Sequence, residues 1–344
     1  MKVCVTGSKG LIGSSITDLL INSKAEVYGI DNNNRNKLFG TDGSTDVFSF
    51  SFFNSTQYKH FNFDLKDIDK LKSFFKKYQF DAVIHCASQP SHPKSIAIPI
   101  LDFEMNTSVT LNLLEILRYS SPKTTFIFTS TNKVYGDNPN LLSFVEKEKR
   151  FDFEDSSYLG IDETMSIDTT THTPFGVSKT AADLYVQEYG STYKMNTVAL
   201  RLGCVTGKYH ASVKQHGFLS FLIKSIIKTR SYEIIGFKGK QVRDQISSED
   251  VALAMLEILK SSPKSTIYNL GGGKKNALSI LEAIDLITEI TGIKPKLSIK
   301  RMGRLGDHRC YYTNNSKFLT DYPNWNIKDR VEKIIEDIIR YEIR

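Results

Sequence analysis

A glycine-rich turn close to the N-terminus is the first feature of the chain that could do chemistry. The segment Gly7-Ser-Lys-Gly10-Leu-Ile-Gly13 follows a short β-branched run and opens into a stretch with the pattern of an amphipathic helix. Glycine is needed where a chain turns tightly and its backbone approaches a pyrophosphate, whose charge is stabilised by the N–H groups at the start of the helix. The turn therefore predicts a dinucleotide phosphate site.

An aspartate at the end of the second predicted strand adds to this site. Asp31 closes the run EVYGID, where a carboxylate can accept hydrogen bonds from a ribose 2′-hydroxyl. Because the same charge repels a 2′-phosphate, we expect the cofactor to be NAD rather than NADP. Two alternatives stay open: Asp31 could serve only as the cap of a turn, and the nearby Arg35 could favour NADP.

Strands that alternate with helices position these residues through the first half of the chain. Such alternation is typical of parallel βαβ units, so we expect an α/β fold with a doubly wound parallel Rossmann sheet of about seven strands. The predicted strands cover residues 2–7, 26–31, 81–88 and 124–131, and the predicted helices cover residues 11–23, 64–78 and 111–120.

A smaller C-terminal lobe is expected to bind the substrate. We expect residues 1–203 to form the cofactor domain, with residues 241–269 returning to it, and residues 204–240 and 270–344 to form the lobe. Between them, residues 137–171 show no sustained periodicity and predict a long connection, which in a compact domain is often functional.

The composition excludes several classes of protein. The chain of 344 residues is 40% hydrophobic and 24% charged, as globular proteins are. No apolar run reaches the roughly 18–20 residues that span a bilayer, so we expect a cytoplasmic protein without a membrane partner. The net charge of +7 is dispersed among 38 acidic residues, which argues against a nucleic-acid partner. The four cysteines lack C-x-x-C spacing, so no metal site is expected.

Matches along nearly the whole chain show which family it resembles. The spacing G-x-x-G-x-x-G, rather than G-x-G-x-x-G, resembles the extended short-chain dehydrogenases/reductases, the NAD-dependent epimerase/dehydratase family. The further matches are Asp64-Leu65, His85-Cys-Ala-Ser88, Asn106, the segment 130–136 with Thr131 at the hydroxyl position, the segment 239–244, and the segment 304–307. The resemblance implies a Rossmann fold, bound NAD and a nucleotide-sugar substrate.

The same resemblance implies which residues bind each ligand. The cofactor residues are Gly7, Gly10, Leu11, Ile12, Gly13, Asp31, Asn32, Asp64, Leu65, Ala87, Gln89, Asn106 and Lys179. The substrate residues are Gln89, Ser91, His92, Thr131, Asn132, Lys133, Gln241, Arg243, Arg304 and Asp307. Arg243 and Arg304 are expected at the diphosphate, because a guanidinium can bond two oxygens at once. We also expect a homodimer or homotetramer.

Three segments narrow the resemblance to one branch. Residues 87–92, 131–136 and 239–244 resemble the CDP-paratose 2-epimerase (CDP-tyvelose epimerase) branch. That branch keeps NAD bound, oxidises the sugar at C2 and returns the hydride to the opposite face, which implies a CDP-hexose substrate. Nucleotide-sugar 4-epimerases and dehydratases share most of these residues and are the alternative.

One position departs from the family. Its Y-x-x-x-K motif reads Phe175-Gly-Val-Ser-Lys179 here, and a phenyl ring has no proton to exchange. Another group could take over the proton transfer, the chemistry could proceed without it, or the site could bind its ligands without turnover. Retention of Lys179 and of Thr131, whose hydroxyl could bond the reacting sugar oxygen, favours takeover. The candidates for the proton transfer are His172, Tyr135, Tyr158 and Lys179 itself.

Overall fold

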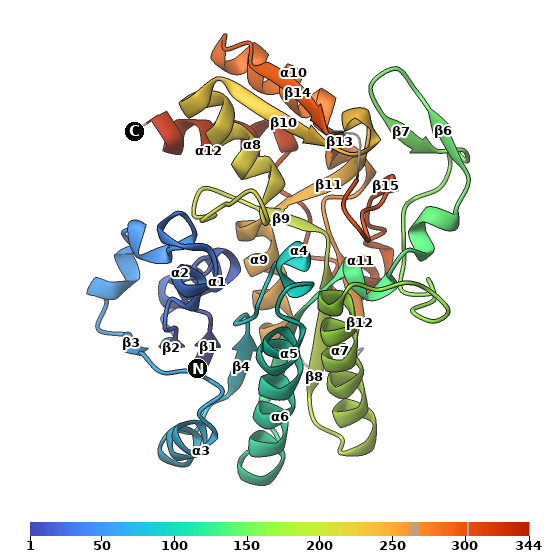
Figure 1. Cartoon of the computed structure of the whole chain (residues 1–344). Helices are drawn as coiled ribbons and strands as arrows, with labels where there is room; N and C mark the ends of the chain where they lie inside the picture. The colour runs from blue at the N-terminus through green and yellow to red at the C-terminus, as the bar shows by residue number, and fades with distance from the viewer. Residues whose placement is uncertain (262, 264–266, 301–302, 344) are drawn as a thin grey trace.

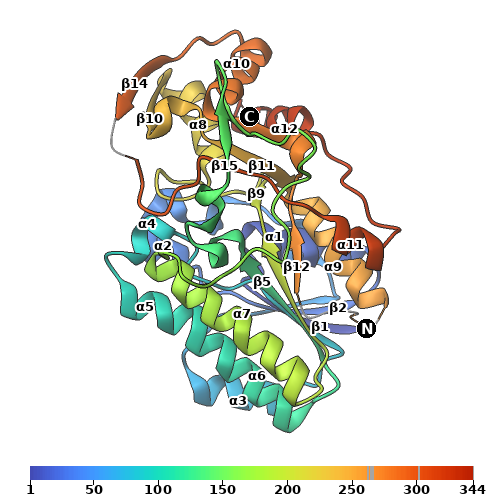
Figure 2. The same ribbon diagram turned by 90° about the vertical axis from the view of Figure 1, so that its right-hand side faces the viewer.

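The computed structural model describes residues 1–261, 263, 267–300 and 303–343. A parallel sheet of seven strands lies at its centre, in the order β12-β8-β5-β4-β1-β2-β3 (Figures 1 and 2), which confirms the doubly wound α/β fold. The strands are β1 (Lys2–Thr6), β2 (Glu26–Ile30), β3 (Tyr58–Phe61), β4 (Ala82–His85), β5 (Thr125–Thr131), β8 (Thr197–Leu202) and β12 (Ile267–Leu270). The order reverses between β1 and β4, the place where ligands bind in such sheets.

Helices cover both faces of the sheet because its strands are apolar on both sides. One face packs against α1 (Leu11–Asn22), α9 (Ser248–Lys260) and α11 (Ser316–Asp321), and the other against α3 (Ile68–Lys77), α6 (Val109–Ser120) and α7 (Pro174–Thr192). Ile16 of α1 and Met255 of α9 are buried in the first core, and Leu71 of α3 and Val186 of α7 in the second. The short helices α2 (Asn34–Phe39), α4 (His92–Ser95) and α5 (Pro99–Phe103) lie in the connections.

A smaller lobe lies at one end of the sheet (Figure 1). Its helices α8 (Phe218–Thr229), α10 (Ile280–Thr291) and α12 (Val331–Ile343) share an apolar core. Its strands are β9 (Cys204–Thr206), β10 (Ser231–Ile235), β11 (Val242–Ser247), β13 (Ala277–Ser279), β14 (Lys296–Lys300) and β15 (Cys310–Tyr311). The chain passes between the two parts several times: α9 and β12 return to the sheet, as does α11, whose Phe318 packs on Tyr268 of β12.

The connection over residues 137–171 is ordered despite its lack of periodicity. It contains the antiparallel hairpin of β6 (Phe144–Glu146) and β7 (Phe151–Phe153). Phe153 packs edge-on against Tyr158 and Tyr312, with ring centres 4.9 Å apart in both pairs. The segment therefore belongs to a small aromatic core beside the lobe.

The described part of the chain contains no membrane-spanning helix, no metal-ligand cluster and no disulfide. None of its helices combines the length and apolar character needed to cross a membrane. It also contains no group of three or more metal-ligating side chains, and all four cysteines are free thiols.

A buried ion pair joins α7 to the middle of the sheet. Arg201 of β8 donates to both carboxylate oxygens of Asp183 on α7, from Nη2 at 2.9 Å and from Nε at 3.2 Å. Ser130 of β5 donates to the same carboxylate at 2.6 Å. Since β5 ends at Thr131 and α7 carries Lys179, this pair sets the relative position of two predicted catalytic residues.

Removing one partner should therefore destabilise the fold strongly. We expect Asp183→Ala to lower the free energy of unfolding by about 3–5 kcal/mol, because it leaves the Arg201 guanidinium buried without its counter-charge. Equilibrium urea unfolding measures this change. Glu257→Ala, which breaks the exposed pair with Lys260 on α9, is the control and should cost less than about 1 kcal/mol. Similar losses in both variants would contradict the assignment.

Candidate functional site

A cavity of about 430 Å³ lies between the carboxyl ends of the strands and the lobe. Residues predicted to bind the cofactor and residues predicted to bind the substrate both line it. From the predicted set, the lining residues are Gly7, Gly10, Leu11, Ile12, Gly13, Asp31, Asn32, Asp64, Leu65, Ala87, His92, Thr131, Asn132, Lys133, Lys179, Gln241, Arg243, Arg304 and Asp307.

The glycine turn brings the start of α1 to this cavity. Gly7 has φ +69°, and a Cβ atom there would lie 2.7 Å from the backbone nitrogen of Ala87. At Gly13 an added Cβ would lie 2.0 Å from the Gly7 carbonyl oxygen. Helix α1 has no side-chain N-cap and no acidic residue in its first turn, so its first N–H groups suit a pyrophosphate. The turn thus fits a dinucleotide.

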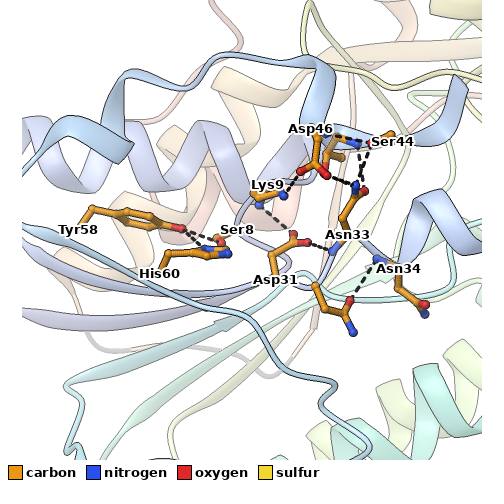
Figure 3. Close-up of polar contacts among 11 residues, drawn as sticks. Ser8, Lys9, Asp31, Asn33, Asn34, Ser44, Asp46, Tyr58 and His60 are labelled. Carbon is orange, nitrogen blue, oxygen red and sulfur yellow. Dashed lines mark hydrogen bonds and ion pairs between the residues drawn. The ribbon is translucent and has the colours of Figure 1, made fainter. Parts of the chain in front are cut away.

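Asp31 both orders its turn and faces the cavity. Its two carboxylate oxygens accept from the backbone N–H groups of Lys9 at 2.9 Å and Asn33 at 2.8 Å (Figure 3). A carboxylate has about four lone-pair positions, so positions are left for ribose hydroxyls. Arg35 also lines the cavity, and two of its guanidinium N–H groups donate to the carbonyls of Gly43 at 3.2 Å and Ala211 at 2.6 Å.

Three residues predicted to contact ligands lie behind the cavity wall instead. Gln89 donates to Asp102 Oδ1 at 2.6 Å and accepts from the Ser91 backbone N–H at 2.6 Å. Asn106 donates to Ser178 Oγ at 3.1 Å and to Asp102 Oδ1 at 3.2 Å. Gln89, Ser91 and Asn106 are buried and absent from the lining. The amides of Gln89 and Asn106 connect the 88–95 segment to Ser178 of α7, directly or through Asp102. The Ser91 hydroxyl donates to the Gln215 carbonyl at 3.0 Å, so all three residues have a supporting place.

The start of α7 forms the middle of the cavity. Thr173 caps the helix and Pro174 occupies its first turn, which places Phe175 and Lys179 on the lining one turn apart. The Lys179 ammonium donates to the Thr129 carbonyl at 2.6 Å and lies 4.1 Å above the centre of the Phe128 ring. Burial lowers the pKa of Lys179 to about 8.

The other candidates for proton transfer lie outside the cavity lining. His172 Nε2 donates to the Val134 carbonyl at 2.8 Å. The Tyr135 hydroxyl donates to Asn269 Oδ1 at 2.7 Å, and burial raises its pKa to about 12. Tyr158 packs in the aromatic core described above. Of the four candidates, Lys179 is the one that faces the cavity.

Positively charged side chains cluster where the lobe borders the cavity. Arg243 forms an ion pair with Asp307 and donates to the His308 carbonyl at 2.7 Å. Lys133 donates to the Gly306 carbonyl at 2.8 Å, and burial lowers its pKa to about 8. Arg304 donates to the Lys214 carbonyl at 2.8 Å. This cluster suits the diphosphate of a nucleotide-sugar.

His92 and several further residues complete the lining. The Nδ1 atom of His92 is buried without a hydrogen-bond partner, and burial lowers the pKa of the ring to about 3. The lining residues that sequence reasoning did not single out include Cys86, Cys204, Tyr209, His210, His216 and Tyr232. Cys86 lies inside a recognised motif, whereas most of the others come from segments that only the fold brings to the site.

Comparisons with known proteins agree with this geometry. The model of the NAD dependent epimerase/dehydratase family matches residues 3–271. The chain is 29% identical to the CDP-paratose 2-epimerase of Salmonella typhi, with 98% of each chain covered. It is 28% identical to a putative UDP-glucose 4-epimerase of Methanocaldococcus jannaschii, with 97% of each covered. The Thermus thermophilus UDP-glucose 4-epimerase complex with NAD has a TM-score of 0.79 at 25% identity, covering 100% of this chain and 99% of that one.

Binding at the cationic end can be tested without turnover. We expect Arg243→Ala to weaken nucleoside-diphosphate binding by about 10- to 150-fold, because a charge-assisted hydrogen bond contributes roughly 1.5–3 kcal/mol. Isothermal titration with CDP and UDP measures the affinity, and the NAD content should not change. Arg309→Ala is the matched control, because Arg309 is exposed and lies just before β15, on the segment that pairs with β11. Loss of NAD with unchanged diphosphate affinity would show that the two ligands are placed the wrong way round.

Proposed function

The chain belongs to the NAD dependent epimerase/dehydratase family, and from this we propose that it is an epimerase of a CDP-hexose. Its cofactor is NAD. The sugar would be oxidised transiently, and the hydride would return to its opposite face. The observation that carries the proposal is the shared cavity: the glycine turn, Lys179 and Arg243 all line the same space. A cofactor at the turn and a diphosphate at the arginine would meet beside Lys179.

Support for a cytidine nucleotide and for C2 is more specific. The segments 87–92 and 239–244 resemble the CDP-paratose 2-epimerase branch, and a relative with that name aligns over 98% of the chain. The alternative is a 4-epimerase or dehydratase, which begins with the same oxidation and differs in the fate of the ketone.

The side chains at the middle of the cavity would transfer the proton of the sugar hydroxyl. NAD supplies the hydride acceptor and donor. Lys179 takes the proton of the sugar hydroxyl and later returns it, since a pKa near 8 leaves a useful neutral fraction at neutral pH. The Thr131 hydroxyl, which accepts from the Lys133 N–H at 3.3 Å and lines the cavity, would bond the reacting oxygen. Phe175 adds an apolar surface there, which favours the neutral amine.

The cationic end orients the substrate. In the free protein Arg243 is neutralised by Asp307, so a diphosphate must compete with that carboxylate for the guanidinium. Arg304 and Lys133 donate to backbone carbonyls in the same region and retain further N–H groups for phosphate oxygens. Binding energy from the nucleotide would thereby hold the sugar against the reacting groups.

Product analysis tests the proposed reaction. We expect incubation of the purified protein with CDP-hexoses to give a C2 epimer of unchanged mass, without net reduction of NAD, because the hydride is returned. Nuclear magnetic resonance and mass spectrometry of the nucleotide-sugar distinguish the outcomes. A C4 epimer from a UDP-hexose, or a product lighter by one water, would favour the alternative. Ligand binding without turnover across CDP-, UDP- and dTDP-sugars would indicate an impaired relative.

The role of Lys179 predicts both a pH dependence and a mutational pattern. Because the neutral amine is the active base, kcat should rise as pH increases through about 8. Lys179→Met should lower kcat by roughly 10²–10⁴-fold while NAD stays bound. Phe175→Tyr should add little, since the proton already has an acceptor. A large gain in Phe175→Tyr, or a kcat that falls through pH 8, would contradict this assignment.

A further inference from the structure

A lysine inside the phosphate turn has no part in the function proposed above. Lys9 follows Ser8 in the turn, and its side chain is only 12% exposed. Its ammonium forms an ion pair with Asp46, as Figure 3 shows, and its backbone N–H donates to Asp31. Lys9 therefore lies directly beside the carboxylate that faces the adenosine ribose.

Asp46 is itself held in place by a closed network. The Asn33 amide donates to Asp46 Oδ2 at 2.6 Å and to Ser44 Oγ at 2.8 Å. The Asn33 backbone N–H donates to Asp31 at 2.8 Å. The contacts thus run from Asp31 to Lys9, on to Asp46, and back through Asn33 (Figure 3). The hydrogen bond from Lys9 holds the pKa of Asp46 below its usual range, so the carboxylate is charged at neutral pH.

The position of this network bears on the choice of dinucleotide. NADP differs from NAD by a phosphate at the ribose 2′-oxygen, next to the place that Asp31 faces. A phosphate is stable there only if a cation accompanies it. Arg35 gives two of its N–H groups to backbone carbonyls, and Lys9, whose backbone N–H donates to Asp31, supplies a second cation close to that carboxylate.

We propose that Asp46 is a specificity-determining residue that excludes NADP by occupying Lys9. Its carboxylate pairs with an ammonium that could otherwise accompany a 2′-phosphate, so the negative charge of Asp31 is not offset by Lys9. Rejection of the phosphate is therefore shared between two carboxylates that lie on different segments. The inference rests on the NAD cofactor of the family and is independent of the sugar and of the proton acceptor.

The fold does not depend on this ion pair. The Asp46 side chain is 63% exposed, and ion pairs at such exposure contribute little to stability. Its segment is anchored by apolar packing: Phe50 and Phe52 are buried in the core with α1, and Phe48 contacts Tyr209 with ring centres 5.6 Å apart. A change of charge at Asp46 should leave that packing in place.

Competition between the two dinucleotides tests the proposal without activity. The protein is dialysed against equal concentrations of NADP and isotope-labelled NAD until the label content is constant, then denatured, and the released cofactors are quantified by mass spectrometry. We expect Asp46→Asn, which keeps an amide oxygen for the bond from Asn33, to raise the NADP-to-NAD ratio at least tenfold. Melting curves check that the variant is folded.

Two control variants show whether a change in the NADP-to-NAD ratio depends on Asp46 and on the Lys9 ammonium. Asp42→Asn removes a neighbouring carboxylate that is 80% exposed and pairs with Lys224, so it should leave the ratio unchanged. Adding Lys9→Met to Asp46→Asn should cancel the gain, because the freed ammonium is then missing. The same comparison is made in an Asp31→Asn background, where repulsion from Asp31 no longer masks the effect.

The outcomes are distinct. A tenfold shift in either background that disappears with Lys9→Met supports the proposal. A ratio within twofold of the parent in both backgrounds, or a gain that survives Lys9→Met, overturns it. Either result is readable even if the protein turns over no CDP-hexose, because only cofactor binding is measured.

Discussion

The packing of α7 against the end of β5 is the contact on which the proposed reacting centre depends. Lys179 donates to the Thr129 carbonyl, and Asp183, one turn further along the helix, binds both Ser130 and Arg201. These contacts place a buried cation and a strand hydroxyl on the same cavity. Because the groups are buried, a small shift of the helix would leave a charge without a partner, and the geometry is therefore tightly specified.

Burial also sets the chemistry of the cations in the cavity. The pKa values of Lys179 and Lys133 both fall to about 8 because the surrounding protein replaces water around each ammonium. The consequences differ with position. Lys179, 4.1 Å above the centre of the Phe128 ring, is the residue proposed to exchange a proton. Lys133, next to Arg243 and Asp307, lies where an anionic diphosphate would restore its charge. Burial thus has a different consequence at each lysine: it favours a neutral amine at Lys179 and phosphate binding at Lys133.

The replacement of the family's tyrosine by Phe175 changes which ionisable group of α7 lines the cavity. In the family's motif a tyrosine hydroxyl would stand between the sugar and the lysine. Here an apolar ring occupies that place, and Lys179 lines the same cavity. Loss of the phenol therefore leaves the lysine as the nearest ionisable group on α7, in an environment that favours its neutral form. The substitution and the buried lysine therefore lie one helical turn apart on the same cavity.

The sequence alone determined the features that are local in the chain. The glycine turn, Asp31 and the Phe175–Lys179 spacing could be predicted because each depends on neighbouring residues, and the strand–helix alternation predicted the sheet because periodicity reports burial. Long-range contacts decided the rest. Gln89 and Asn106 match family motifs, yet their hydrogen bonds to Asp102 and Ser178 hold them behind the cavity wall. Tyr135 is buried beside Asn269 and Tyr158 packs on an aromatic core, so neither lines the cavity.

The contact between Lys9 and Asp46 shows the same limit most clearly. The segment that carries Asp46 has no periodicity or motif to mark it, and nothing in the sequence relates that aspartate to the phosphate turn. Only apolar packing of the neighbouring phenylalanines against α1 brings the two charges together. Residue types determine which chemistry is available, but which charges meet is decided by how distant segments bury their apolar surface, since that burial is the main force that assembles the tertiary structure.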